Sequence, residues 1–340
     1  MPLTADNAEP IDAVIAWVDG SDPQHAARLD AYLAGLGGAR PAMAHPTRFD
    51  HAGEIDWCVA SILRFAPWMR TIHIVTDRQT PALLTRLRGT PFAERVRVVD
   101  HREIFAGYED CLPTFNSRSI SSLFWRIHGI ADRHIYFNDD FVLLRSVRPD
   151  YFFRDGRVVV HGRWATQSHR HWIKRAAQRL GFERQAGQHP TESRAQDLSA
   201  RLAGFERRCF RLEHCPYPMR AATLAGFFAE HPDLLRETIA HRLRHPEQLR
   251  PESLAVHLEL ARHAAVTDTH LRLVQIKPAE QWFPRLRARL ARADRDPRAA
   301  FACAQSLDLA PPRVREHLIG WLNRRVGTLD RFRRDQAALA

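Results

Sequence analysis

Two adjacent carboxylates, Asp139 and Asp140, follow the apolar run 134–137 (HIYF) and Asn138. A strand that ends in such a pair presents hard oxygen ligands at its exit. Mg²⁺ or Mn²⁺ held by carboxylates can bridge a diphosphate and neutralise charge as a phosphate bond breaks. Turns also favour aspartate, so the pair alone does not separate a metal ligand from a turn residue. It is the first candidate metal site.

A second candidate is the segment 112–117 (LPTFNS), just before a predicted helix over Ser119–Ile127. Asn116 or Ser117 can serve as the N-cap of that helix. The free N–H groups of a helix N-terminus also bind anions, so a phosphate could dock there. Arg126 would add a guanidinium group if it faces the edge of the sheet.

The third candidate is His214, in the segment 213–218 (EHCPYP). Imidazole titrates near neutral pH, which suits a general base, although a lone histidine is more often a surface or core residue. Downstream, the basic turn 241–246 (HRLRHP) could bind phosphate or simply face water.

The elements that carry these residues alternate between strand and helix over residues 1–160. Such alternation predicts the α/β fold class, with a mainly parallel Rossmann-like sheet flanked by helices. Ligands of such sheets bind beyond the carboxyl ends of the strands, where Asp19, Asp77 and the pair Asp139 and Asp140 fall. The predicted strands are Ile11–Val18, Thr71–Thr76, Arg95–Val99 and His134–Phe137, and a further helix is predicted over Ile55–Phe65.

The second half of the chain has a different pattern. Residues 161–212 are polar, basic and weakly patterned, which predicts an insertion or mobile loop. Residues 213–340 form a helical portion that returns to the core. Helices are predicted within Pro218–Ala265, with breaks at Pro232, Pro246 and Pro251. A short α/β return is predicted around Leu271–Ile276 and Ala300–Ala304, followed by a basic amphipathic helix or pair of helices over Pro311–Arg334.

The formal net charge of the 340 residues is +11. Such an excess suits a polyanionic partner, either nucleic acid, anionic lipid or acidic polysaccharide, or a solvated arginine-rich surface. No nucleic-acid motif and no aromatic stacking platform accompanies it, so nucleic acid is not expected. No secretory signal or bilayer-spanning run is found, which predicts a cytoplasmic protein. The five cysteines form no CxxC pair and are expected to be buried free thiols.

The order of these motifs resembles the four conserved regions of the Stealth family, which are bacterial capsular-polysaccharide hexose-1-phosphate transferases. The family is related to the eukaryotic enzyme that adds N-acetylglucosamine-1-phosphate to lysosomal glycoproteins. The resemblance runs from Ile11 to about Gly327 and is weakest over residues 161–211. The segments that carry it are IDAVIAWVDGSD, ILRFAPWMRTIHIVTD, LPTFNSRSI with RIHGIADRHIYFNDD, and HCPYP with HRLRHPEQ.

The resemblance implies a glycosyltransferase-A-like fold and a reaction in which an acceptor hydroxyl attacks the sugar-linked phosphorus of a nucleotide sugar. A nucleoside monophosphate leaves and a phosphodiester to a polysaccharide forms. The implied roles are Mg²⁺ ligation by Asp139 and Asp140, general base for His214, and phosphate binding for Arg244. The resemblance also implies that Trp17, Asp19 and Gly20 lie near the nucleotide. Asp77, Asn116 and Ser117 are expected there from their places at a strand exit and a helix N-terminus.

The sequence departs from the family pattern in three segments. Asp56 and Ala60 stand where the family has arginines, and Arg48 or Arg64 could compensate for them. Gln305 and Ser306 replace the family's Asn-Asp, for which the nearby Asp308 could substitute. His128 replaces a proline. The first two departures leave the ligands of metal and phosphate incompletely assigned.

Two other functions stay open. A conventional metal-dependent glycosyltransferase would use a similar fold but release a nucleoside diphosphate. A non-catalytic polysaccharide- or membrane-binding protein would fit the lost Asn-Asp and the basic surface. The basic helix Pro311–Arg334 also predicts peripheral docking on the inner face of the cytoplasmic membrane.

Overall fold

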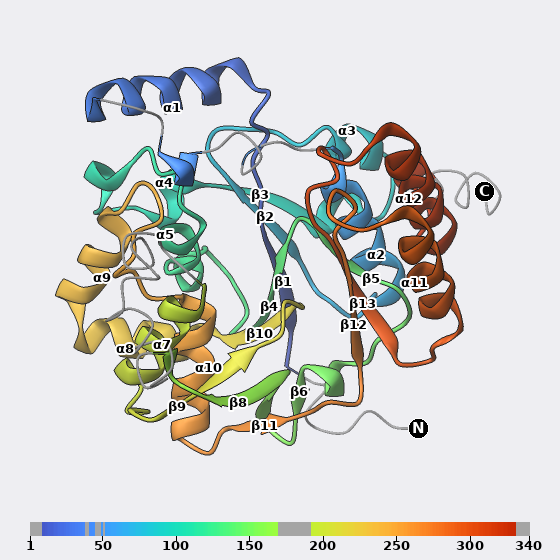
Figure 1. Ribbon diagram of the computed structural model, residues 1–340. Coiled ribbons are helices and arrows are strands. Elements are labelled where there is room, and N and C mark those ends of the chain that lie inside the picture. Colours follow the sequence, from blue (N-terminus) through green and yellow to red (C-terminus); the bar gives the residue numbers. More distant parts are fainter. Residues whose placement is uncertain (1–8, 38–40, 45–48, 50–51, 169–191, 331–340) are drawn as a thin grey trace, which may run out of the picture.

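The computed structural model describes residues 9–37, 41–44, 49, 52–168 and 192–330. Its centre is a five-stranded sheet in the order β10-β4-β1-β2-β3 (Figure 1). Four strands run parallel, and β10 pairs antiparallel with β4 at one edge. The strands are β1 (Ile11–Ala16), β2 (Ile72–Thr76), β3 (Val96–Asp100), β4 (Arg133–Asn138) and β10 (Tyr217–Arg220). The predicted α/β class and mainly parallel sheet are confirmed.

The parallel strands form where their apolar runs can be buried on both faces of the sheet. Every residue of β2 is buried, and β1 is buried except at its last residue. Asp12 is the charged exception, and it accepts hydrogen bonds from Arg70 Nε at 2.9 Å and Nη2 at 2.6 Å. Although burial opposes it, hydrogen bonds from His73 and Arg70 keep the pKa of Asp12 well below its usual range.

Short helices connect these strands. The predicted helix Ser119–Ile127 is instead two elements, because α5 ends at Ser121 and a separate 3-10 turn follows. The hydroxyl of Ser122 donates to the carbonyl of Arg118 at 2.8 Å, a local bond that competes with helix propagation. The elements are α1 (Pro23–Leu36), η2 (Ala42–Ala44), α2 (Glu54–Phe65), α3 (Leu83–Leu87), η4 (Ala93–Arg95), α4 (His101–Ile104), η5 (Glu109–Cys111), α5 (Ser117–Ser121) and η6 (Phe124–Arg126).

A second sheet, in the order β12-β13-β5, attaches the end of the chain to the exit of β4. It comprises β5 (Phe141–Leu143), β12 (Arg272–Ile276) and β13 (Ala299–Ala304). The α/β return predicted around 271–276 and 300–304 is thus two parallel strands joined by a helix. Cys303 pairs with Phe141, and the Ala304 N–H donates to the Asp140 carbonyl at 3.1 Å. This pairing brings Cys303 beside the acidic pair. A third sheet contains β6 (Phe153–Arg154), β7 (Arg157–Val160) and β11 (Ala265–Thr267). The 3-10 turn η7 (Pro149–Tyr151) precedes β6.

The segment 161–212, expected to be a loop or insertion, contains regular structure. It forms the antiparallel pair β8 (Gly162–Thr166) and β9 (Arg208–Leu212), and helix α7 (Glu192–Leu202), which packs against α10 and β9. Their buried apolar residues are few and separated by arginines, which conceals the pattern in the sequence. Residues 169–191 lie outside the described part of the chain.

The C-terminal portion begins with α8 (Ala221–Glu230). Prolines begin the helices α9 (Pro232–Ala240), α10 (Pro251–Ala261) and α12 (Pro312–Arg325), as their fixed φ favours. The predicted breaks at Pro232 and Pro251 are confirmed. Figure 1 shows α5, α8, α9 and α10 on one side of the central sheet, and α2, α11 (Phe283–Arg295) and α12 (Pro312–Arg325) on the other.

Helix α12 packs its apolar face into the protein. Leu318, Trp321 and Leu322 are at most 3% exposed, so these side chains are not available to a lipid surface. No helix within the described ranges is both long enough and apolar enough to cross a membrane. All five cysteines are buried and free, as predicted.

Three buried histidines make stability depend on pH. Burial lowers the pKa of His101, His134 and His257 to about 4, from the usual 6.5. Between these values the unfolded chain binds protons that the folded protein excludes, so the free energy of unfolding should fall as pH drops from about 6.5 to 4. The raised pKa of Asp140 opposes this trend, whereas the pKa of His214, which is also lowered to about 4, adds to it. We expect a loss of several kcal/mol in urea denaturation at pH 4.5 relative to pH 7. Constant stability over that range would contradict the prediction.

Candidate active site

A cleft of about 630 Å³ opens beyond the carboxyl ends of the parallel strands. Trp17 follows β1, Asp77 follows β2, and Asp139 and Asp140 follow β4, and all four line it. This is where ligands of open α/β sheets bind. The polar and charged residues that line it further are Ser117, Arg118, Asn138, Glu192, His214, Arg244, Arg250, Glu252 and Gln305.

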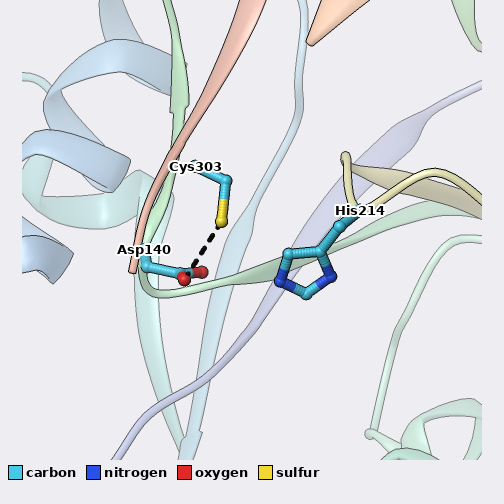
Figure 2. A group of neighbouring side chains, drawn as sticks. All are labelled: Asp140, His214 and Cys303. Atoms are coloured by element: carbon cyan, nitrogen blue, oxygen red, sulfur yellow. Dashed lines mark hydrogen bonds between the residues drawn. The ribbon is translucent and has the colours of Figure 1, made fainter. Parts of the chain in front are cut away.

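Asp140, His214 and Cys303 form a compact group in this cleft (Figure 2). One potential ligand atom from each lies within 4.8 Å of the others. The Cys303 thiol donates to Asp140 Oδ2 at 3.2 Å, while Asp140 Oδ1 is buried without a hydrogen-bond partner. Burial raises the pKa of Asp140 to about 6. A buried acceptor with no donor is the environment expected of a cation ligand.

The imidazole of His214 is held by two neighbours. Its Nδ1 lies 3.0 Å from Tyr217 Oη, and its Nε2 lies 3.4 Å from Asn138 Nδ2. Tyr217 Oη also accepts from Arg250 Nη2 at 2.7 Å. Because the amide nitrogen of Asn138 is a donor, its contact with Nε2 favours the tautomer that carries the proton on Nδ1 and the lone pair on Nε2. Figure 2 shows the nitrogen remote from the side-chain attachment turned toward Asp140.

Burial, followed by the charges of Arg250 and Arg244, lowers the pKa of His214 to about 4. The ring is therefore neutral at pH 7 and able to accept a proton, although it is a weaker base than the ordinary imidazole expected from the sequence. An anion bound to the two arginines would offset their charge and raise this pKa.

Three arginines on the same cleft, Arg118, Arg244 and Arg250, surround the carboxylate of Glu192, and we refer to them as the arginine cluster. Arg118 Nη2 and Arg244 Nη1 lie 3.1 and 3.2 Å from Glu192 Oε1. Arg250 Nη1 lies 3.3 Å from Oε2. Although burial opposes it, the charges of Arg250, Arg118 and Arg244 lower the pKa of Glu192 to about 2. Sequence reasoning found only Arg244. The nearby signals were Arg118 directly after Ser117, and Arg250 six residues after Arg244.

Ser117 also joins this cluster, since Arg244 Nη2 donates to its hydroxyl at 2.9 Å. Asn116, in contrast, is fully buried. Its side chain caps α5 by accepting from the Arg118 N–H and donates to Gln248 Oε1 at 2.9 Å. The capping reading therefore holds for Asn116, and the expected contact with the nucleotide does not fit this position.

Arg126 does not line the cleft, so it does not add the guanidinium group expected beside a phosphate there. Its Nη1 and Nη2 donate to the carbonyls of Ile104 and Ala106 at 2.9 and 2.7 Å. It lies in η6 and not on the helix that begins at Ser117. A guanidinium held by two carbonyls supports the local loop.

Asp19 and Gly20 also lie outside the cleft lining. Asp19 Oδ1 accepts from the N–H and hydroxyl of Ser21, which fixes the turn after β1. A Cβ on Gly20 would lie 2.5 Å from the Phe49 carbonyl oxygen, so close backbone packing explains this glycine. Both residues shape the rim and do not line the space where a ligand would bind.

The departures from the family pattern have local explanations. Asp56 forms an ion pair with Arg86, and Ala60 is buried in α2. Arg64 donates to the carbonyl of Val326 at 2.6 Å and does not line the cleft, so it does not compensate. Arg48 lies outside the described residues. Gln305 lines the cleft where the family has asparagine, while Asp308 is not among its lining residues.

Comparison with family models finds two matches. The model of Stealth protein conserved region 1 matches residues 9–37, and that of conserved region 2 matches residues 48–160. An exopolysaccharide phosphotransferase of Streptomyces coelicolor is 34% identical over 255 residues, which cover 73% of this chain and 43% of the relative. A capsular polysaccharide phosphotransferase of Actinobacillus pleuropneumoniae is 34% identical over 150 residues, covering 44% and 40% respectively. This chain thus spans less than half the length of either relative.

Two solved structures align over most of the chain. Mouse xyloside xylosyltransferase 1 has a TM-score of 0.40 and 10% identity, covering 87% of this chain and 97% of its own. The galactosyltransferase LgtC has a TM-score of 0.40 and 12% identity, covering 92% and 95%. No functional conclusion follows from TM-scores of this size.

Proposed function

This chain carries conserved regions 1 and 2 of the Stealth proteins, and on that premise we propose that it is a sugar-1-phosphate transferase. The donor is a nucleotide sugar, and the acceptor is a hydroxyl of a cell-surface polysaccharide. The products are a phosphodiester and a nucleoside monophosphate. The names of the relatives, which are exopolysaccharide and capsular polysaccharide phosphotransferases, support this reaction class.

One observation carries the proposal: a carboxylate pair, a neutral imidazole and three arginines share a single cleft at the carboxyl edge of the sheet. Phosphoryl transfer depends mainly on positioning and on neutralising charge, with a base to remove the hydroxyl proton. Each requirement has a matching group. The arginine cluster can hold the phosphates, and His214 can receive the proton.

The oxygen donors of the cleft fit a divalent cation such as Mg²⁺. Asp140 Oδ1 is a buried acceptor without a partner, and Asp139 and Gln305 line the same space. Mg²⁺ prefers such oxygen ligands, whereas the Cys303 thiol and His214 imidazole suit softer metals. When bound, Mg²⁺ would neutralise charge on the diphosphate. We therefore assign ligation to Asp139 and Asp140 and leave His214 for proton transfer.

The bond changes balance as follows. The acceptor oxygen forms a bond to the sugar-linked phosphorus, and the bond from that phosphorus to the bridging oxygen breaks. The hydroxyl proton moves to Nε2 of His214, and the electron pair leaves on the nucleoside monophosphate. In this tautomer Tyr217 Oη accepts a hydrogen bond from the Nδ1–H group of His214, which keeps the imidazole ring oriented while the ring becomes cationic.

Identification of the released nucleotide tests the reaction class. The protein is incubated with Mg²⁺, an acceptor polysaccharide and a panel of nucleotide sugars, and nucleotides are separated by ion-exchange chromatography. We expect a nucleoside monophosphate, together with a phosphodiester resonance in the phosphorus NMR spectrum of the polymer. A nucleoside diphosphate would establish the conventional glycosyltransferase instead. Glycan binding without turnover of any donor would favour a non-catalytic protein.

Peripheral contact with the inner membrane is a separate proposal. It would rest on basic side chains alone, because the apolar face of α12 is packed inside the protein. Co-sedimentation with anionic and neutral vesicles measures it, and equal binding to both would reject it.

A further inference from the structure

The arginine cluster carries more positive charge than its neighbours offset. Glu192 contacts all three arginines, while Glu252 accepts only from Arg250 among them, with 3.2 Å between its Oε2 and Arg250 Nε. The side chain of Arg118 is 4% exposed, and its Nη1 is buried without a hydrogen-bond partner. A buried cationic donor is costly unless it is paired. The cluster is therefore suited to an anion with more oxygens than one carboxylate.

Glu192 covers the cluster from its open side. Its side chain is 51% exposed, against 4%, 31% and 11% for Arg118, Arg244 and Arg250. The carboxylate can therefore turn into solvent while the guanidinium groups stay fixed. Arg244 is additionally held by Ser117, and Arg250 by Tyr217 and Glu252.

Guanidinium groups bind phosphate with the same geometry as carboxylate, and a diphosphate offers more charge and more acceptors. We propose that the Glu192 carboxylate occupies the binding site of a substrate phosphate group, which must displace it to reach Arg118 and Arg250. The inference rests on the proposed function, since the phosphate is that of the nucleotide-sugar donor. The resemblance already implies phosphate binding by Arg244. The roles of Arg118 and Arg250 in phosphate binding, and the displacement of Glu192, are new.

Asp56 and Ala60, which stand where the family has arginines, do not contribute to this cluster. Asp56 is engaged with Arg86, and Ala60 lies in the core, so neither position offers charge to the cleft. Arg118 and Arg250 supply two guanidinium groups from α5 and from the residue before α10. The chain thus obtains its phosphate-binding charge from other positions.

Titration calorimetry with inorganic pyrophosphate in EDTA tests this without any turnover. Because the variant removes a competing negative charge, Glu192→Gln should bind pyrophosphate about 10-fold more tightly than wild type, equivalent to 1.4 kcal/mol. Glu192→Asp, which keeps the charge, should stay closer to wild type. Arg118→Gln and Arg250→Gln should each bind about 10-fold more weakly. Glu206→Gln is the matched control, because Glu206 is exposed and contacts none of the three arginines.

The outcomes separate this inference from the proposed function. If Glu192 only orders the arginines, Glu192→Gln will bind pyrophosphate more weakly than wild type, and its melting temperature will fall. That result would overturn the inference. So would a pyrophosphate affinity of Glu192→Gln equal to that of Glu206→Gln, or the absence of pyrophosphate binding by both wild type and Glu192→Gln. Tighter binding by Glu192→Gln without sugar-phosphate transfer would support the site and reject the reaction. Sugar-phosphate transfer by the wild type, together with a pyrophosphate affinity that Glu192→Gln leaves unchanged, would support the reaction and reject the site.

Discussion

Replacement of His214 by alanine is expected to lower kcat for sugar-phosphate transfer by about 10³-fold, within the range found for general bases. The physical reason is the position of Nε2, which is turned toward Asp140 while Nδ1 is held by Tyr217. Binding of the donor should change little, because the phosphates contact arginines and the metal site in this mechanism. Calorimetry with a donor analogue measures binding, and release of the nucleoside monophosphate measures kcat.

A matched control is His270→Ala, which removes an exposed imidazole that is not among the residues lining the cleft. It should leave both measurements unchanged. His25 and His101 also line the cleft, but they lie near Asp77, whose charge acts on both rings. His214→Ala enzyme with near-normal kcat would exclude the base role, while equal losses of donor binding and kcat would indicate that the ring supports the site structurally.

The central sheet and the acidic pair could be predicted from sequence because their signals are local. A buried parallel strand is a short apolar run, and Asp139 and Asp140 follow directly after one. Since parallel strands end at one edge, Asp77 and the pair could be expected near one another. Only the family resemblance indicated that His214 belongs to the same site as these carboxylates. Its actual neighbour β10 had no strand signal, since Pro218 lies inside it.

The rest depends on contacts between distant parts of the chain. Cys303 meets Asp140 across 163 positions because β13 pairs with β5, and no local pattern encodes that pairing. Arg118 and Arg250 converge on Glu192 for the same reason. Arg126 is the opposite case. Its motif indicated a phosphate-binding arginine, but backbone carbonyls bind its guanidinium group in the structure. Residue type and spacing give candidates, and tertiary packing selects among them.

Replacement of Asp140 by asparagine is expected to have opposite effects on activity and on stability. The amide keeps the shape of the side chain but not its charge, so Mg²⁺-dependent donor binding should be lost and kcat/KM should fall by about 10³-fold. Asp139→Ala should also weaken metal-dependent donor binding. Donor binding measured at increasing Mg²⁺ concentrations checks both variants.

In EDTA, Asp140→Asn should unfold at higher urea concentration than wild type. Burial raises the pKa of Asp140 to about 6, from the usual 3.8, so at pH 7 the folded protein bears the cost of an ionised buried carboxylate. The neutral amide removes that cost, worth up to about 3 kcal/mol. Mg²⁺ should stabilise wild type but not the variant. A carboxylate kept only for structure would give the reverse, a loss of stability with donor binding intact. A metal ligand is expected to show both effects: its carboxylate destabilises the metal-free protein, and the cation does not bind without it.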